Sequence, residues 1–231
     1  MPEAPRCYSF SMKRFRLLLL ASGRGSHVVN LVHATRDGRI DGEVTRVICD
    51  RPDAPVLSEA RALGVPVTLL ESAGPGARLP AAAEAEILAA ARADAIGLVA
   101  LCGFMRLLSG DLIEGFGVPV LNVHPALLPS FRGLHAQRQA IEAGVRVTGV
   151  TVHFVDAGMD TGPILLQAAL SIRPDDTEET LSKRLLPLEH RVYAEAIRLY
   201  ASGAVRREGR RVTIQPGAVP DWVALDAERE N

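Results

Sequence analysis

Short apolar runs alternate with helical patterns over the first 145 residues of the chain. Five runs predict strands: 15–21, 44–50, 65–70, 95–101 and 118–123. The first is short and continuously apolar, as expected for a strand buried on both faces of a parallel sheet. Helical spacing and helix-forming composition predict helices between them, over 27–36, 56–63 and 81–92. Ser26 is placed to cap the first helix and Gly64 to end the second. This alternation predicts βαβ units and an α/β fold with a mostly parallel central sheet.

The pattern changes after residue 145. Two strand-like runs, 147–155 and 164–172, are separated by a turn-rich segment, which predicts an antiparallel C-terminal addition to the same sheet. A long helix over 177–201 then closes the domain, with threonines near its start and a glycine after its end. We expect one domain over 15–215, a loose N-terminal leader over 1–14 and a mobile tail over 216–231.

Composition and charge narrow the class of partner. Hydrophobic residues make up 48% of the 231 residues and charged ones 23%, a globular balance with material for one core. The formal net charge of -1 gives no reason to expect nucleic acid or a membrane surface as partner, and no apolar run reaches the roughly 18 residues that span a bilayer. Three scattered cysteines form no disulfide framework or metal cluster and indicate a reducing, cytoplasmic setting: Cys7, Cys49 and Cys102.

The first strand runs into a glycine-rich loop that opens the first helix. Gly23 and Gly25 let the backbone approach a ligand closely, and a helix start directs unpaired N–H groups toward an anion. Ser26 adds a hydroxyl donor. The third glycine of a dinucleotide fingerprint is absent because position 28 is Val, so a sugar phosphate or mononucleotide suits the loop better than NAD. The same residues also fit an ordinary tight turn between strand and helix.

The strongest candidate for chemistry is the end of the fifth apolar run. Side chains alternate along a strand, so Asn122 and His124 point the same way, and Pro125 stops the strand there. In an open α/β sheet, the carboxyl ends of the strands face the ligand crevice. An acid follows in the turn between the two later strands, and spacing alone does not choose between Asp156 and Asp160.

These motifs together resemble the phosphoribosylglycinamide formyltransferase family. The resemblance spans about 16–200 and rests on ordered segments: Ser-Gly-x-Gly-Ser at 22–26, Gly-Phe-Met-Arg-Leu-Leu at 103–108, Asn-Val-His-Pro-Ala-Leu-Leu-Pro at 122–129, and Met-Asp-Thr-Gly-Pro-Ile at 159–164. It implies a single Rossmann-like formyltransferase domain in de novo purine biosynthesis. The co-substrate would be 10-formyltetrahydrofolate, the acceptor glycinamide ribonucleotide, and no metal would take part. The partners would be these small molecules, and the protein a monomer or homodimer.

The resemblance also implies roles for individual residues. Asn122, His124 and Asp160 would be catalytic, with Asp160 keeping His124 protonated and oriented. The ribonucleotide phosphate and ribose would be held by Gly23, Arg24, Gly25, Ser26, His27 and Glu189. The folate would lie against Arg78, Met105, Arg106, Leu107, Leu108, Asn122, Ala157, Gly158, Met159 and Asp160. We interpret His135 and His153, which lie in matched segments, as structural residues or as supports of the catalytic side chains, rather than as groups that take part directly in the chemistry.

The chain departs from the family at three places. Arg24 and His27 stand where the family usually has Asn, and residues 130–132 replace a commoner Lys-Tyr-Pro. Alternatives with related chemistry are methionyl-tRNA formyltransferase, which needs an added RNA-binding domain, and formyltetrahydrofolate deformylase, which usually carries an N-terminal regulatory domain. A non-catalytic nucleotide- or folate-binding module is the alternative from a different class.

Overall fold

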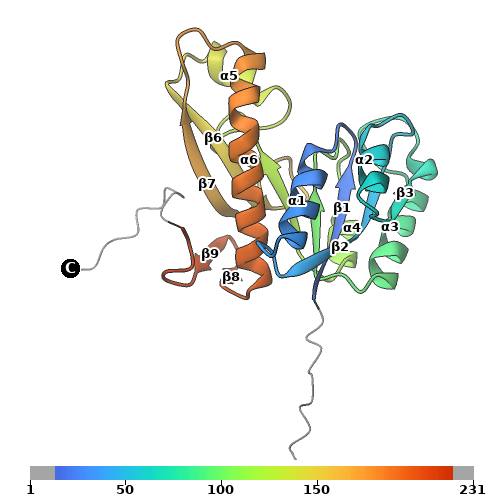
Figure 1. Cartoon of the computed structure of the whole chain (residues 1–231). Helices are drawn as coiled ribbons and strands as arrows, with labels where there is room; N and C mark the ends of the chain where they lie inside the picture. The colour runs from blue at the N-terminus through green and yellow to red at the C-terminus, as the bar shows by residue number, and fades with distance from the viewer. Residues whose placement is uncertain (1–13, 221–231) are drawn as a thin grey trace, which may run out of the picture.

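A seven-stranded sheet forms the centre of the computed structural model, which describes residues 14–220 (Figure 1). Its strands are β1 (Phe15–Ala21), β2 (Gly42–Cys49), β3 (Val67–Leu69), β4 (Leu98–Leu101), β5 (Val120–His124), β6 (Val147–Phe154) and β7 (Ile164–Ser171). They lie in the order β3-β2-β1-β4-β5-β6-β7, in which β3 to β5 are parallel and β6 and β7 are antiparallel additions. The expected α/β fold with an antiparallel extension is confirmed.

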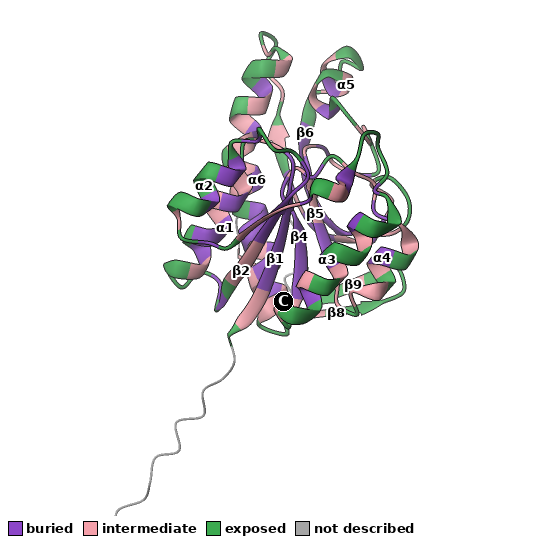
Figure 2. Cartoon of the chain, turned by 90° about the vertical axis from the view of Figure 1, so that its right-hand side faces the viewer, coloured by how far each residue is buried: buried purple, intermediate pink, exposed green. Residues whose placement is uncertain are grey.

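Helices cover both faces of the parallel part. Figure 2 shows its buried strands between two helical layers, one with α1 (Ser26–Arg36), α2 (Val56–Ala62) and α6 (Glu178–Ala201), the other with α3 (Ala81–Ala93) and α4 (Gly110–Gly115). Leu17 and Leu19 of β1 pack into the first layer, and Leu18 and Leu20 into the second. Because β1 is buried on both faces, its sequence is a continuous apolar run rather than an alternating one.

The long helix α6 ties the parallel and antiparallel parts together. It begins after Thr177, whose side chain accepts the Thr180 amide hydrogen while Thr180 reaches back to the Thr177 amide. Further along, the fully buried Tyr193 hydroxyl lies 3.0 Å from the carbonyl oxygens of Leu101, the last residue of β4, and Leu121, the second residue of β5. The helix therefore fixes the two central strands β4 and β5 in place.

Four local expectations were wrong or incomplete. The helices α4 and α5 (Ala136–Glu142) and the 3-10 turn η1 (Glu71–Ala73) were not expected, because elements of three to seven residues carry little helical periodicity. The hairpin of β8 (Val205–Glu208) and β9 (Arg211–Ile214) was missed because its sequence is mostly charged. Ser26 makes no side-chain cap, since Gly25 occupies the cap position with φ +86°. The strand expected over 95–101 begins only at Leu98, after Ala95 with φ +47°.

Several expectations concern residues beyond the part that the structure describes. Residues 1–13 of the expected leader, with Cys7, and residues 221–231 of the expected tail lie outside the described residues. Cys49 and Cys102 are free and buried, as small core residues are. Within 14–220, no helix combines the length and the apolar character that crossing a membrane requires.

Candidate active site

A cavity of about 380 Å³ opens at the carboxyl ends of β4 and β5. Its walls come from four segments: the loop after β4, the end of β5, the loop before α5, and the turn between β6 and β7. β5 is the border strand of the sheet, since it pairs in parallel with β4 and antiparallel with β6. The cavity therefore receives side chains from both parts of the fold, where an α/β sheet ordinarily binds its ligand.

Asn122 and His124 both line this cavity, as expected from their alternation along β5. Asn122 is half-buried and pairs across the strands with His153 of β6, while His124 is 4% exposed and pairs with Thr151. Pro125 follows directly and the chain leaves the sheet there. The prediction that these two polar side chains share one side of the strand end is confirmed.

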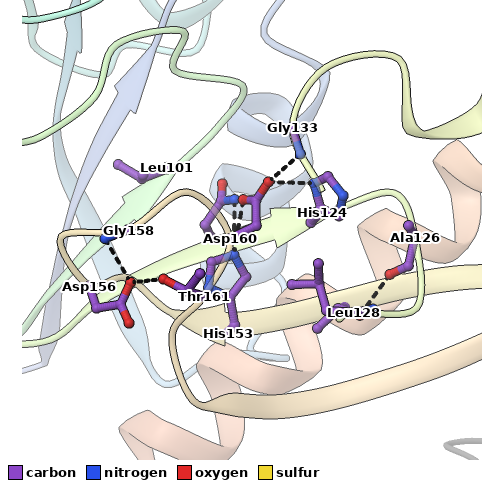
Figure 3. A network of polar contacts seen from close by, with 12 residues as sticks. Leu101, His124, Ala126, Leu128, Gly133, His153, Asp156, Gly158, Asp160 and Thr161 are labelled. Atoms are coloured by element: carbon purple, nitrogen blue, oxygen red, sulfur yellow. Dashed lines mark hydrogen bonds and ion pairs between the residues drawn. The ribbon is translucent and has the colours of Figure 1, made fainter. Parts of the chain in front are cut away.

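Asp160 faces two histidines from the turn between β6 and β7 (Figure 3). Its Oδ2 accepts the Gly133 amide hydrogen at 2.9 Å and lies 3.4 Å from Nδ1 of His124. Its Oδ1 lies 3.5 Å from Nε2 of His153. Asp156 instead accepts hydrogen bonds from the Gly158 amide and the Thr161 hydroxyl, within the turn itself. Geometry thus separates the two acids that spacing left equal: Asp160 faces the histidines, and Asp156 stabilises the turn.

The surroundings of Asp160 favour its ionised form. Burial alone raises the pKa of the Asp160 carboxyl, but hydrogen bonds from His153 and the Gly133 amide, with the charges of His124 and His153, outweigh it and lower the pKa below its usual range. Asp160 also has φ +51°, a conformation uncommon outside glycine. The turn therefore holds a carboxylate in one defined position.

Both ring nitrogens of His124 face oxygen acceptors. Nε2 lies 2.8 Å from the carbonyl oxygen of Phe131, which can only accept, so Nε2 carries a hydrogen. Nδ1 faces the Asp160 carboxylate at 3.4 Å. Acceptors on both sides hold the imidazole in one orientation, with Nδ1 directed at the carboxylate. The Phe131 loop is itself fastened, because Thr151 donates to the Ala126 carbonyl at 2.7 Å and accepts the Leu128 amide hydrogen at 3.0 Å.

His153 has a closer part in the site than the sequence indicated. Its Nδ1 lies 3.0 Å from the Phe154 carbonyl oxygen, and its Nε2 lies 3.2 Å from Nδ2 of Asn122 and 3.5 Å from Asp160. His153 therefore contacts two of the three expected catalytic side chains. The signal that could have found it is the cross-strand pairing with Asn122, which requires the strand register.

The glycine-rich loop lies at the end of β1, next to β4 in the sheet. A side chain at Gly25 would overlap Val56, 2.7 Å from the position of its Cβ, so the loop is tightly packed against α2. Arg24 is exposed, and with Ser26 it lines a second hollow of about 400 Å³ between α1, α2 and α6. His27 points toward α6, where its Nε2 lies 3.0 Å from Oε2 of Glu189. His27 of the loop is thus in contact with Glu189, and the binding of the ribonucleotide by these residues stays a prediction.

The expected folate residues lie mainly around the cavity. Its lining includes Met105, Arg106, Leu107, Leu108, Asn122, Ala157, Gly158, Met159 and Asp160. Met105 and Met159 are about half exposed at its mouth, an unusual position for large apolar side chains. The Arg106 guanidinium is already bound, to Asp50 at 2.6 Å and to the carbonyls of Gly74 and Gly76. Arg78 is exposed and does not line the cavity. Its backbone pairs with that of Leu107, which does.

Over the described range, no group of three histidine, cysteine, aspartate or glutamate side chains is arranged to hold a metal ion. What the cavity presents instead is an amide, two imidazoles and a carboxylate within hydrogen-bonding reach of one another. Such a set can stabilise a developing oxyanion and move protons.

A Rossmann-like sheet with an Asn-x-His strand end, and an acid turned toward it from the antiparallel addition, defines a group-transfer enzyme. The chain belongs to the formyl transferase family, whose model matches residues 15–197. It is 40% identical to phosphoribosylglycinamide formyltransferase of Bacillus subtilis over 187 aligned residues. The alignment covers 81% of this chain and 94% of the relative. The structure of glycinamide ribonucleotide transformylase 1 from Symbiobacterium toebii superposes with a TM-score of 0.82 at 46% identity, covering 87% of this chain and 94% of the other. The expected resemblance is confirmed.

Two further comparisons match only part of a longer protein or share only the fold. The chain is 37% identical over 199 residues to the human trifunctional purine biosynthetic protein adenosine-3, and spans only 20% of that protein's length. A formyltetrahydrofolate deformylase from Pseudomonas syringae has a TM-score of 0.81 at 23% identity, covering 88% of this chain and 67% of the other. At that identity the likeness concerns the fold alone.

Proposed function

We propose that this protein transfers the formyl group of 10-formyltetrahydrofolate to the amine of glycinamide ribonucleotide, by direct attack through a tetrahedral intermediate. The observation that carries the proposal is the convergence of Asn122, His124 and Asp160 on one cavity beside a glycine-rich helix start. The similarity to proteins named phosphoribosylglycinamide formyltransferase, over most of both chains, supports the same substrates.

His124 is proposed to stabilise the negative charge that develops on the formyl oxygen. Its Nε2 hydrogen is engaged by the Phe131 carbonyl, so Nδ1 is the nitrogen that serves the reacting atoms. The 3.4 Å separation from Asp160 is longer than a strong charge-assisted hydrogen bond, so the Nδ1 hydrogen, which is fixed in the ring plane, can be shared with a substrate oxygen placed beside that carboxylate. A charged donor directed at that oxygen stabilises the transition state more than the ground state.

Asn122 is proposed to be the second donor to the formyl oxygen, and His153 to set its orientation. The Nε2 atom of His153, which donates to Asp160, also lies 3.2 Å from the Asn122 amide. A donor at that place favours the orientation in which the amide turns its oxygen toward the ring. The amide nitrogen is then free for the substrate.

Asp160 is proposed to orient the His124 and His153 rings and to position the water that removes the proton of the attacking amine. Its lowered pKa keeps it ionised at neutral pH, as this role requires. The loop of Gly23, Gly25 and Ser26 would hold the phosphate with backbone N–H groups at the start of α1. The apolar surface of Met105, Leu107 and Leu108 would face the folate ring.

The test is a folate-product absorbance assay on the purified chain. The protein is mixed with 10-formyltetrahydrofolate in the presence and absence of glycinamide ribonucleotide. We expect tetrahydrofolate to form only when the ribonucleotide is present, and His124→Ala to abolish most of that rate. A matched control is His33→Ala, which removes an exposed histidine in the last turn of α1.

The rival activities give different results in the same assay. Product formed equally well without the ribonucleotide would favour the deformylase, with water as acceptor. A rate that depends on methionyl-tRNA would favour the tRNA formyltransferase. Binding of folate and ribonucleotide without turnover would leave a non-catalytic binding module as the correct description.

A further inference from the structure

A small buried cluster of ionisable side chains joins the glycine-rich loop to α6. His27 is the second residue of α1, and its Nε2 lies 3.0 Å from Oε2 of Glu189. The ring of His27 packs edge-to-face against the ring of His190 at 5.0 Å and that of Tyr193 at 5.9 Å. The side chains of His27 and Glu189 are each only 12% exposed. A histidine therefore stands between a buried carboxylate and the loop proposed to bind a phosphate.

This arrangement creates an electrostatic problem that the histidine can solve. A buried carboxylate is costly unless it is paired, and it repels a phosphate brought close to it. Charged His27 neutralises Glu189, whereas neutral His27 only donates one hydrogen bond to it. Nδ1 of His27 is buried and has no hydrogen-bond partner among the described residues. With the Nε2 hydrogen directed at Glu189, an added proton goes to Nδ1.

The groups around His27 act in opposite directions. Glu189 favours the charged ring, while burial, the positive end of α1 and the exposed Arg24 in the same loop oppose it. Tyr193 stays neutral, because burial raises the pKa of its hydroxyl well above the ordinary value. Burial, and then the neighbouring His27, lower the pKa of His190. Farther out, Glu59 of α2 and His33 of α1 line the adjoining hollow.

With these influences opposed, an additional charge beside the ring can decide its state. A phosphomonoester at neutral pH carries close to two negative charges, since its second pKa is about 6. We propose that His27 takes up one proton from solvent when a phosphomonoester dianion binds the 23–27 loop, and that the charged ring then holds Glu189 in position for the ribose hydroxyls. This inference rests on the proposed function, since it assigns the phosphate of the acceptor substrate to this loop.

The proposal makes His27 a positioning residue whose effect depends on pH. The family that the chain resembles usually has Asn at this position, and an amide cannot take up a proton. His27→Asn therefore removes the titration together with the reach to Glu189. His27→Gln is the sharper variant, because its amide nitrogen can occupy the place of Nε2 and keep the hydrogen bond to Glu189 without the charge.

The experiment is isothermal titration calorimetry with ribose 5-phosphate as probe, between pH 7 and 9, in buffers with different ionisation enthalpies. The dependence of the heat on the buffer counts the protons taken up on binding. We expect wild type to take up a substantial fraction of one proton and its Kd to rise by as much as about tenfold per pH unit, as linkage requires. Both His27 variants should take up none and give a Kd independent of pH, while His33→Asn should behave as wild type.

Three results would overturn the proposal. They are binding of the probe by wild type without proton uptake, equal uptake by His27→Gln, and no detectable binding of ribose 5-phosphate at millimolar concentration. The formyl-transfer assay separates these failures from failure of the proposed function. Turnover that requires glycinamide ribonucleotide, in a protein whose probe binding is not linked to protons, would leave the transferase standing and remove only the role of His27.

Discussion

The substitution Asp160→Asn removes one negative charge from the site and leaves a side chain of nearly the same size. An asparagine oxygen can still accept the Gly133 amide hydrogen, which lies 2.9 Å from Oδ2 in the wild type, so the turn should hold its shape. The attraction to the ring nitrogens of His124 and His153, at 3.4 and 3.5 Å, is lost. The substitution thus isolates the charge of Asp160 from its structural role.

The size of the effect follows from these distances. At 3.4 Å and an effective dielectric constant of about 20, two unit charges attract each other by roughly 5 kcal/mol. The Asp160 side chain is 13% exposed, and the burial of both groups offsets part of this attraction. A net loss of about 3–4 kcal/mol in the transition state corresponds to a fall in kcat of roughly 10²- to 10³-fold. KM should change much less, because the charge acts mainly on the reacting atoms.

The assay is steady-state production of tetrahydrofolate at saturating concentrations of both substrates. The matched control is Asp156→Asn in the same turn, whose carboxylate holds the Gly158 amide and the Thr161 hydroxyl and for which kcat should fall less than about tenfold. A folded Asp160→Asn protein with kcat within threefold of wild type would refute the reasoning. Equal losses in the two variants would mean that the shape of the turn, and not the charge of Asp160, supports catalysis.

The pH dependence of kcat is a second test of the role of the Asp160 charge. Because the pKa of Asp160 lies below its usual range, the carboxylate stays ionised above about pH 5, and a loss of rate between pH 5 and 7 must come from another group. In Asp160→Asn this carboxylate ionisation is absent, so the fall of the rate that wild type shows as the pH drops below about 5 should be lost. Superimposable normalised profiles for wild type and variant would contradict this role.

Three further substitutions probe the supports of the site. Tyr193→Phe leaves the carbonyls of Leu101, at the end of β4, and Leu121, within β5, without their shared donor, and should lower the free energy of unfolding by about 1–3 kcal/mol. A urea melt with an unchanged midpoint would contradict this. Thr151→Val removes the hydroxyl that fastens the loop carrying the Phe131 carbonyl. We expect kcat to fall about tenfold and KM for the folate to rise. Unchanged kinetics would show that the loop keeps its position without this hydroxyl. Gly25→Ala places a methyl group 2.7 Å from Val56, at a residue whose φ is +86°. We expect KM for the ribonucleotide to rise and kcat to change less. An unaltered KM would exclude the loop from substrate binding.

The parts of the fold that the sequence predicted are those in which burial leaves a periodic pattern. The run 17–20 is apolar throughout because alternate leucines enter the two cores, and that continuity identifies a central parallel strand. Asn122 and His124 were placed on one side by strand alternation alone. By contrast, α5 is only seven residues long and begins after His135 at φ +58°, a start for which helical periodicity gives no signal.

Tertiary contacts explain what the sequence could not supply. The choice between Asp156 and Asp160 depends on how one turn folds against His124, and the part of His153 depends on the register between β5 and β6. Arg106 lines the cavity as expected, but the sequence did not indicate the partners of its guanidinium. These are Asp50, 56 positions earlier, and the carbonyl of Gly74. Pairings over such separations are properties of the assembled sheet.

The position of β5 in the sheet separates binding from chemistry in this molecule. On its parallel side lies the glycine-rich loop at the start of α1, where helix geometry supplies N–H donors that suit an anion whatever reaction follows. On its antiparallel side, β6 places His153 opposite Asn122, and the turn that follows turns Asp160 toward His124. Changes in the glycine-rich loop should therefore appear mainly in KM for the phosphorylated substrate, and changes in the turn between β6 and β7 mainly in kcat. A double variant that combines Gly25→Ala with Asp160→Asn tests this division, since the two free-energy losses should add within about 0.5 kcal/mol if the sites act independently.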